Sequence, residues 1–420
     1  MAEPASSVEI DHHSPEFLAD RSARWAELRE RCPVTWNRAY GGFWVVTGYD
    51  DVAAVARDAD TFSHRFDLDA DDGLAYRGIC GVPRAASIPR QGVSEIDGPA
   101  HADLRRVLNP FFTPLHVQRL RPRADALADE LLDAVAPTGH ADLVHDYATP
   151  LPAVLTLEMM GMPSGNWRHY ADFFHASSSY LPSEPEFRAA AARVPDMMAE
   201  LVEFARHRRD SPANDITTAL VTCELDGRAP SDAEVGNIMW NLVAGGIDTT
   251  TSLTGWALHH LGTEPPARDR LVGDRSLLPT AIEEYLRHYS PNETLTRTAT
   301  RDVELGGEHI RRGDVVLISW IAANHDETAF DRAGEVVLDR APNKHLAFGG
   351  GRHRCIGAHL ARMETEVMLE HVLDRIPDYV VDQAAFRPSP GNVLMNTVVS
   401  LPVTFTPAGS PAPSGSGRST

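Results

Sequence analysis

Hydrophobic positions along the chain follow two different patterns. Short β-branched and aromatic runs at residues 42–47 (Gly-Phe-Trp-Val-Val-Thr), 315–319 (Val-Val-Leu-Ile-Ser) and 401–405 (Leu-Pro-Val-Thr-Phe) predict strands. Between residues 104 and 262 the apolar positions follow a mainly helical pattern. The sequence therefore predicts a mainly α fold with a minor β portion.

One segment predicts an unusually long helix. Residues 231–234 have the Ser-x-x-Glu spacing of a capping box, and Gly262 suits the other end. A helix of that length spans roughly 45 Å at 1.5 Å per residue. Asp248 is the only formal charge across residues 237–260, so a membrane span is one interpretation. The four hydroxyl residues at 249–252 are unfavourable in lipid, and we expect instead a buried helix through the centre of a helical domain.

Composition and charge narrow the class of protein. The chain has 420 residues, 43% of them hydrophobic, and a formal net charge of −20. This apolar content excludes disorder over the whole chain, and the acidity disfavours nucleic acid or anionic lipid as a partner. Length alone would suggest two or three domains, but no linker interrupts the pattern. We therefore expect an N-terminal extension (1–15), a single domain (16–406) and a flexible Pro/Gly/Ser-rich tail (407–420), in a cytoplasmic protein with no secretory signal.

Four scattered cysteines form neither a disulfide framework nor a zinc motif: Cys32, Cys80, Cys223 and Cys355. Cys355 stands out because it follows three glycines at 349–351, lies beside Arg352 and Arg354, and precedes a predicted helix. Helix-terminal N–H groups and nearby cations favour a thiolate. A buried structural cysteine after a glycine-rich loop is the alternative.

The spacing Phe348-x-x-Gly351-x-x-x-Cys355-x-Gly357 resembles the haem-binding loop of the cytochrome P450 family. The resemblance extends from about residue 43 to residue 405. It implies a long central helix over a buried haem b, with Cys355 as the thiolate ligand of the iron. Such a thiolate donates electron density that favours cleavage of the O–O bond. Phe348, Gly349 and Gly357 would belong to the same cofactor-binding loop.

A second match lies in the long helix, where residues 245–250 read Gly-Gly-Ile-Asp-Thr-Thr. By resemblance, Asp248 and Thr249 form an acid–alcohol pair that delivers protons during activation of O₂. The pair favours O₂ with external electrons over a peroxide-dependent reaction. A helix kink with threonine hydroxyls bonded back to the helix is the alternative interpretation.

Further positions match the family in structural or cofactor-binding roles. Glu284 and Arg287 have i, i+3 spacing on one helix face and are expected to join Arg340 in a buried set that supports the cysteine loop. Haem propionates need cationic partners. The resemblance assigns that role to His101, Arg105, Arg297 and His353.

The resemblance also implies partners. We expect a monomer that binds O₂ and a small-molecule substrate, with electrons from a separate ferredoxin or flavodoxin and its NAD(P)H reductase. Those carriers are acidic, like this chain. Arginines expected on the cysteine side could form a basic docking patch: Arg105, Arg106, Arg352, Arg354 and Arg362.

The expected substrate pocket is lined by Trp240, Val243, Ala244, Ile247, Asn292, Glu293, Leu295 and Met395. The loop of residues 63–92 is long and charged, and the polar pair Asn292 and Glu293 favours a partly functionalised molecule, such as a secondary-metabolite intermediate. Outward-facing loop polarity is the alternative interpretation of that pair. The leading hypothesis is a monooxygenase that hydroxylates or epoxidises that molecule. Oxidative coupling or ring formation is a second hypothesis, and a non-catalytic haem- or ligand-binding protein is a third.

Overall fold

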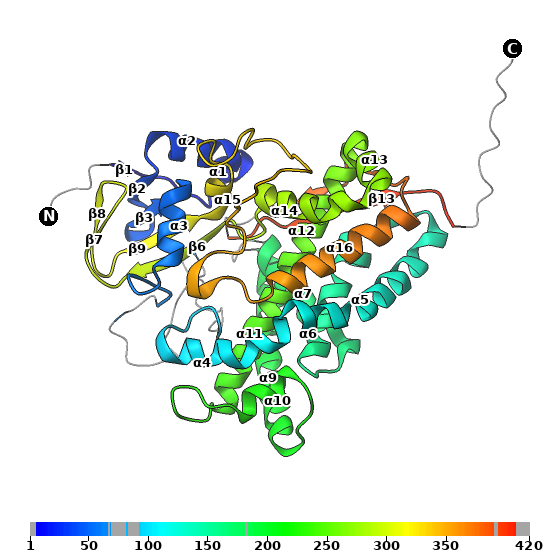
Figure 1. The fold of residues 1–420 in the computed structure, drawn as a ribbon, viewed down its shortest axis with the longest axis horizontal. Helices are drawn as coiled ribbons and strands as arrows, with labels where there is room; N and C mark the ends of the chain where they lie inside the picture. The colour runs from blue at the N-terminus through cyan, green and yellow to red at the C-terminus, as the bar shows by residue number, and fades with distance from the viewer. Residues whose placement is uncertain are drawn as a thin grey trace, which may run out of the picture.

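The computed structural model describes residues 6–65, 68, 81–82, 92–180, 184–389 and 394–408. Figure 1 shows a sheet-containing part that holds the first strands, and a larger helical part beside it. The prediction of a mainly α fold with a minor β portion is confirmed. Within the described residues, no helix is both long and apolar enough to cross a bilayer.

A six-stranded sheet joins segments from both ends of the chain. Its order is β1 (Ser7–Val8), β2 (Val34–Asn37), β3 (Phe43–Val46), β9 (Val315–Ser319), β6 (Thr294–Ala299) and β4 (Phe62–Ser63). Strand β3 runs parallel to β9, with Val45 opposite Leu317, whereas β6 is antiparallel to β9. The strands predicted at 42–47 and 315–319 are confirmed. Residues 7–8 of the expected N-terminal extension form β1 and pair with β2.

Smaller sheets complete the β portion. Strand β13 (Pro402–Thr404), which confirms the prediction at 401–405, lies between β10 (Val380–Val381) and β5 (His140–Asp142). Two further pairs are β7 (Val303–Leu305) with β8 (Glu308–Ile310), and β11 (Arg387–Pro388) with β12 (Val398–Ser400).

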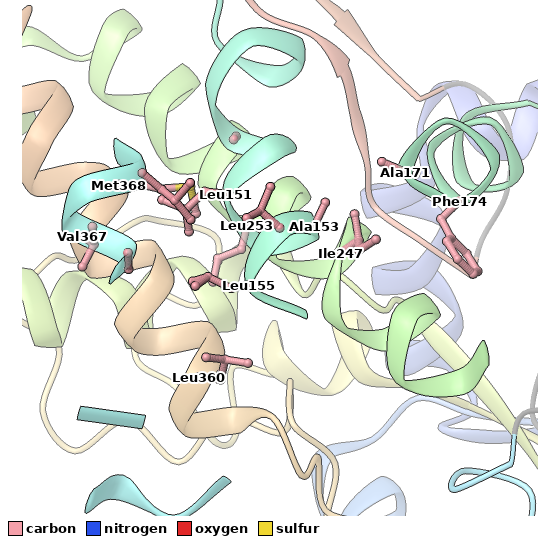
Figure 2. Close-up of a cluster of buried hydrophobic side chains, with 14 of the residues drawn as sticks. Leu151, Ala153, Leu155, Ala171, Phe174, Ile247, Leu253, Leu360, Val367 and Met368 are labelled. Atoms are coloured by element: carbon pink, nitrogen blue, oxygen red, sulfur yellow. The ribbon is translucent and has the colours of Figure 1, made fainter. Parts of the chain in front are cut away.

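The helices enclose one large hydrophobic cluster, part of which is drawn in Figure 2. Around the sheet lie α1 (Pro15–Ala19), α2 (Arg21–Arg31), α3 (Tyr49–Arg57) and α15 (Trp320–Asn324). The helical part contains α4 (Gly98–Leu108), α5 (Pro114–Val135), α6 (Pro150–Met159), α7 (Trp167–Ser179), α8 (Pro185–Ala191), α9 (Val194–Asp210), α10 (Ile216–Thr222), α11 (Asp232–Gly246), α12 (Asp248–Thr263), α13 (Pro265–Gly273), α14 (Leu278–Tyr289) and α16 (Ala358–Arg375).

The predicted long helix is present but interrupted. Its capping box at residues 231–234 is formed, and α11 and α12 meet at Ile247, which has φ −91° and ψ −72°. Three hydroxyls next to this break, those of Thr249, Thr251 and Ser252, donate to carbonyl groups four residues earlier. Such back-bonding competes with the helical ladder and bends helices. The prediction of one continuous helix was therefore wrong, because the helix is interrupted once, within the Gly-Gly-Ile-Asp-Thr-Thr motif of residues 245–250.

The end of α12 also differs from the prediction. Gly262 lies inside the helix, which continues to Thr263. A Cβ atom there would lie 2.5 Å from Val381 Cγ2 and 2.8 Å from Tyr379 Cε2. Gly262 therefore allows close packing on β10 and the residue before it, and is not a helix stop.

Candidate functional site

The glycine-rich loop before α16 presents Cys355. Gly349 and Gly351 have φ values of +66° and +61°, which favour glycine. A Cβ atom on Gly351 would lie 2.9 Å from the carbonyl oxygen of Ala56 in α3. The backbone N–H of Cys355 donates to Phe348 O at 2.9 Å and closes the loop. Cys355 is thus held three residues before the first residue of α16.

Protein atoms and charges surround the Cys355 thiol, yet its side chain is accessible to solvent. Burial raises its pKa above the ordinary value, and this outweighs the N–H of Gly357 and the charges of Arg105, Arg354 and Arg362. The N–H of Gly357 and the three arginines thus act in favour of the thiolate, against the protein atoms packed around the sulfur. A metal ion bound at sulfur would supply the missing positive charge, because coordination deprotonates a thiol.

A cluster of histidine side chains lies beside this loop. The ring of His353 stacks on His64 at 3.5 Å and on His101 at 4.0 Å between centroids. Burial lowers the pKa of His101 to about 4, and the neighbouring charges of His353 and Arg105 act in the same direction. Arg297 similarly adds to the lowering of the pKa of His64 and His353, which burial dominates.

This cluster fits an anionic group. Among the described residues, the buried Nε2 atom of His101 has no hydrogen-bond partner. An arginine, closely stacked imidazoles and an unsatisfied ring nitrogen are complementary to carboxylates, as the two haem propionates would supply. His353 is oriented by Asp97 Oδ1, 3.0 Å from Nε2. His64 was missed from the sequence; its only signal is its position directly after a short strand, β4.

The acid and the alcohol of α12 have separate partners. The hydroxyl of Thr249 donates to Gly245 O at 2.8 Å, which is the back-bonding considered as the alternative interpretation. Asp248 is buried, and its Oδ1 atom lies 3.4 Å from Nδ1 of His175 in α7. The two residues are adjacent in the chain, but the structure does not join their side chains by a hydrogen bond.

Helices α12 and α16 pack against each other. Leu253 of α12 and Leu360 and Val367 of α16 belong to the same hydrophobic cluster and are labelled in Figure 2. Burial raises the pKa of Glu364 in α16 well above the ordinary value, and among the described residues its Oε1 atom has no hydrogen-bond partner. The packing joins the helix that carries Asp248 and Thr249 to the helix that follows Cys355.

The pocket residues expected on α11 fall into two groups. Trp240, Val243 and Ile247 are at most 1% exposed and form part of the core. Trp240, for example, packs against Phe173 at 5.2 Å between ring centroids. In this structure these three side chains are buried in the core and do not open to solvent. Gly245 and Thr249, spaced i and i+4, share an accessible face, and Ala244 beside them is partly exposed.

Asn292 and Glu293, the polar pair before β6, also lie in different surroundings. Glu293 is fully buried, and its Oε1 atom pairs with Arg21 of α2 at 2.6 Å. Burial raises its pKa, although Arg21 opposes that shift. Its expected pocket position is therefore wrong. The backbone of Asn292 forms an isolated antiparallel β-bridge with that of the buried Met395. Asn292 and Leu295 are both partly exposed. Most of the charged loop at 63–92, with Cys80, lies outside the described residues.

Glu284 is the centre of a buried charged network. Arg287 Nε donates to Glu284 Oε2 at 2.8 Å, and Arg340 Nε donates to the same oxygen at 2.9 Å. Arg287 also donates to the carbonyl oxygens of Asn324, Ala333 and Glu335. The network ties α14 to the end of α15 and to the segment that leads into the cysteine loop.

The expected basic patch is largely compensated by acids. Arg352 pairs with Asp60 at 2.6 Å, Arg106 with Asp103 at 2.7 Å, and Arg362 with Glu283 at 2.5 Å. Arg105 donates to the carbonyl oxygen of Arg354 at 3.0 Å. The cluster is therefore a mixed surface of paired charges and not a field of free cations.

Comparison with known proteins agrees with this geometry. Residues 152–377, more than half of the chain, match the family model described as Cytochrome P450. The chain is 34% identical to 6-deoxyerythronolide B hydroxylase of Saccharopolyspora erythraea, over 87% of this chain and 91% of that protein. It is also 34% identical to mycinamicin IV hydroxylase/epoxidase of Micromonospora griseorubida, over 91% and 95% respectively.

A solved structure of a post-tailoring hydroxylase (HmtN) involved in himastatin biosynthesis has the same fold. Its TM-score is 0.79 at 32% identity, and the match covers 92% of this chain and 97% of that one. Both the residues and the relatives indicate a haem-thiolate enzyme. The chain belongs to the cytochrome P450 family and is a monooxygenase whose cofactor is haem b.

Proposed function

We propose that this enzyme hydroxylates or epoxidises a partly functionalised small molecule, a secondary-metabolite intermediate. Electrons would come from a separate ferredoxin or flavodoxin and its NAD(P)H reductase. The observation that carries the proposal is the accessible face of the α11–α12 junction. Gly245 and Thr249 share that face next to a helix break, and α12 packs against α16, the helix that follows Cys355.

The residues divide the chemistry between them. Haem bound at Cys355 supplies the activation of O₂ by an iron thiolate. His64, His101, Arg297 and His353 would hold its propionates. Thr249 and Asp248 would provide the hydroxyl and the carboxyl group that pass protons to the reacting oxygen, while the buried Glu284 network keeps the loop in place.

Two observations support a functionalised substrate. The side chain of Asn292 is partly exposed beside Met395 and can donate and accept hydrogen bonds. The relatives named above include a hydroxylase of 6-deoxyerythronolide B, a hydroxylase/epoxidase of mycinamicin IV and a post-tailoring hydroxylase of himastatin biosynthesis. An accessible amide favours a ligand that carries hydroxyl, amide or amine groups.

A ligand screen followed by reconstitution tests the proposal. We expect 6-deoxyerythronolide B, mycinamicin IV or another oxygen- or nitrogen-bearing biosynthetic intermediate to shift the haem absorption spectrum. Incubation with ferredoxin, reductase and NADPH should then add one oxygen atom to the bound compound, as mass spectrometry would show. Conversion into coupled or dehydrogenated products of unchanged oxygen content would contradict the proposed reaction.

Cys355→Ser provides the matched control for the cofactor. It keeps a small side chain with a lone pair but removes the thiolate. We expect the characteristic spectrum of the reduced, CO-bound thiolate enzyme to disappear, together with turnover. A variant that keeps both would refute Cys355 as the ligand.

A further inference from the structure

The buried Asp248 has one titratable neighbour among the described residues, and that neighbour lies on another helix. His175 of α7 places Nδ1 3.4 Å from Asp248 Oδ1, and the two side chains are 12% and 3% exposed. The proposed role of Asp248 requires a supply of protons, because a buried carboxyl group does not exchange directly with water. His175 is the group in hydrogen-bonding range that can supply them.

A second histidine connects this pair to the surface. His145, in the helical turn Val144–Ala148, is exposed. Its ring centroid lies 5.3 Å from that of His175, with the rings at 73°. One solvent-accessible imidazole, one nearly buried imidazole and one buried carboxyl group therefore follow one another, and the last belongs to the residue before Thr249.

The charges around His175 favour its protonated form. Burial alone would lower its pKa, but Asp248 and the weaker neighbours together leave the pKa raised above the ordinary value. The backbone carbonyl of Val399 and the carboxylate of Asp142 act in the same direction. Four groups thus face His175: the carboxylates of Asp248 on α12 and Asp142 at the end of β5, the carbonyl of Val399 on β12, and the ring of His145. Three of these four favour an imidazolium.

We propose that His175 is the proton donor to Asp248 and that His145 is the surface group that reloads it. The inference rests on the proposed function of Asp248 and Thr249. In the step, the Nδ1–H bond of His175 breaks and an O–H bond forms on Asp248. The imidazolium becomes neutral, and the carboxylate becomes a carboxylic acid. A proton from water restores the imidazolium, so the two protons consumed with each O₂ and two electrons come from solvent.

The kinetic test compares His175→Gln with His169→Gln, a matched change in the same helix. Glutamine can still donate a hydrogen bond to Asp248 but cannot carry a proton. Because the protonated form is the donor, wild-type product formation should fall as pH rises through the raised pKa of His175. In His175→Gln we expect kcat lower by on the order of tenfold, an unchanged substrate affinity and no such descending limb. His169→Gln should behave as wild type.

A second readout does not depend on turnover. In the haem-loaded protein with ¹⁵N-labelled histidine, the titration of His175 should move to lower pH in Asp248→Asn, because the attracting charge is gone. An unmoved titration would show that the pair does not exist in solution and would overturn the inference. So would a His175→Gln enzyme that retains the wild-type rate and pH limb, which would confine His175 to a positioning role. Failure of the proposed function would look different, since wild type itself would form no oxygenated product.

Discussion

At the scale of single residues, Thr249 has two competing hydrogen-bonding opportunities. In the structure its hydroxyl donates to Gly245 O at 2.8 Å, next to the interruption of the helix at Ile247. The same hydroxyl lies on the accessible face, so it can turn toward a bound ligand when that bond opens. A net hydrogen bond of about 1 kcal/mol is small enough to exchange during turnover.

Thr249→Ala should therefore uncouple electron consumption from product formation. We expect NADPH to be consumed at a similar rate, with product per NADPH lower by about fivefold and a matching rise in hydrogen peroxide, since about 1 kcal/mol of positioning energy is lost. Thr249→Ser keeps the hydroxyl and should stay close to wild type. Equal coupling in the alanine variant would mean that the protons reach oxygen by another route.

At the scale of secondary-structure elements, the sequence predicts which helices and strands form better than it predicts where they begin and end. The strand pattern at residues 42–47 and the capping box at 231–234 are local signals, and both elements form where predicted. The break at Ile247 and the role of Gly262 depend on side chains from elsewhere in the chain, which no local pattern contains. The same reason explains why Trp240 was placed in the pocket and why Arg21 was not anticipated as the partner of Glu293.

Gly262→Ala tests whether this glycine serves packing or ends the helix. Alanine gains about 1 kcal/mol of helix propensity, but its Cβ atom would meet Val381 and the buried ring of Tyr379. Overpacking typically costs about 1–3 kcal/mol, so we expect a net destabilisation of about 1 kcal/mol in urea unfolding. Gly273→Ala is the control, because a Cβ atom at that helical position has no neighbour within 4 Å. If both variants are equally stable, the close approach at Gly262 is not maintained in solution.

A larger loss of stability is expected from breaking the Glu284 network, which holds the segment that leads to Cys355. Glu284→Gln leaves two buried guanidinium groups without their counter-charge, and breaking a buried pair costs about 3–5 kcal/mol. We expect a lower melting temperature and a lower ratio of haem to protein after purification. Glu335→Gln changes an exposed carboxylate nearby, 3.5 Å from Arg332, and should alter neither quantity. Normal haem content in Glu284→Gln would separate the network from the cysteine loop.

At the scale of the whole molecule, the net charge of −20 must be reconciled with the acidic electron carriers proposed above. The arginines near Cys355 do not provide an uncompensated positive field, because several are paired with acids. When a carrier docks on such a surface, each arginine must exchange the carboxylate it pairs with in this chain for a carboxylate on the carrier. Exchange of this kind orients a partner and adds little affinity. The association should therefore be weak, transient and sensitive to salt.

Arg352→Glu tests this arrangement against Arg206→Glu. Both arginines are about equally exposed, at 61% and 56%, and each is paired with acids, Arg352 with Asp60 and Arg206 with Glu203 and Asp232. Arg352 lies three residues before Cys355, whereas Arg206 lies on α9.

Reversing a surface charge changes the interaction by about 1 kcal/mol, so KM for ferredoxin should rise about fivefold in Arg352→Glu, with kcat unchanged. The CO-bound spectrum should stay that of wild type, which would exclude damage to the haem site. High salt should weaken the wild type more than the variant, because the attraction being screened is already lost. An equal rise in KM for Arg206→Glu would show that net charge alone, and not this surface, controls the encounter.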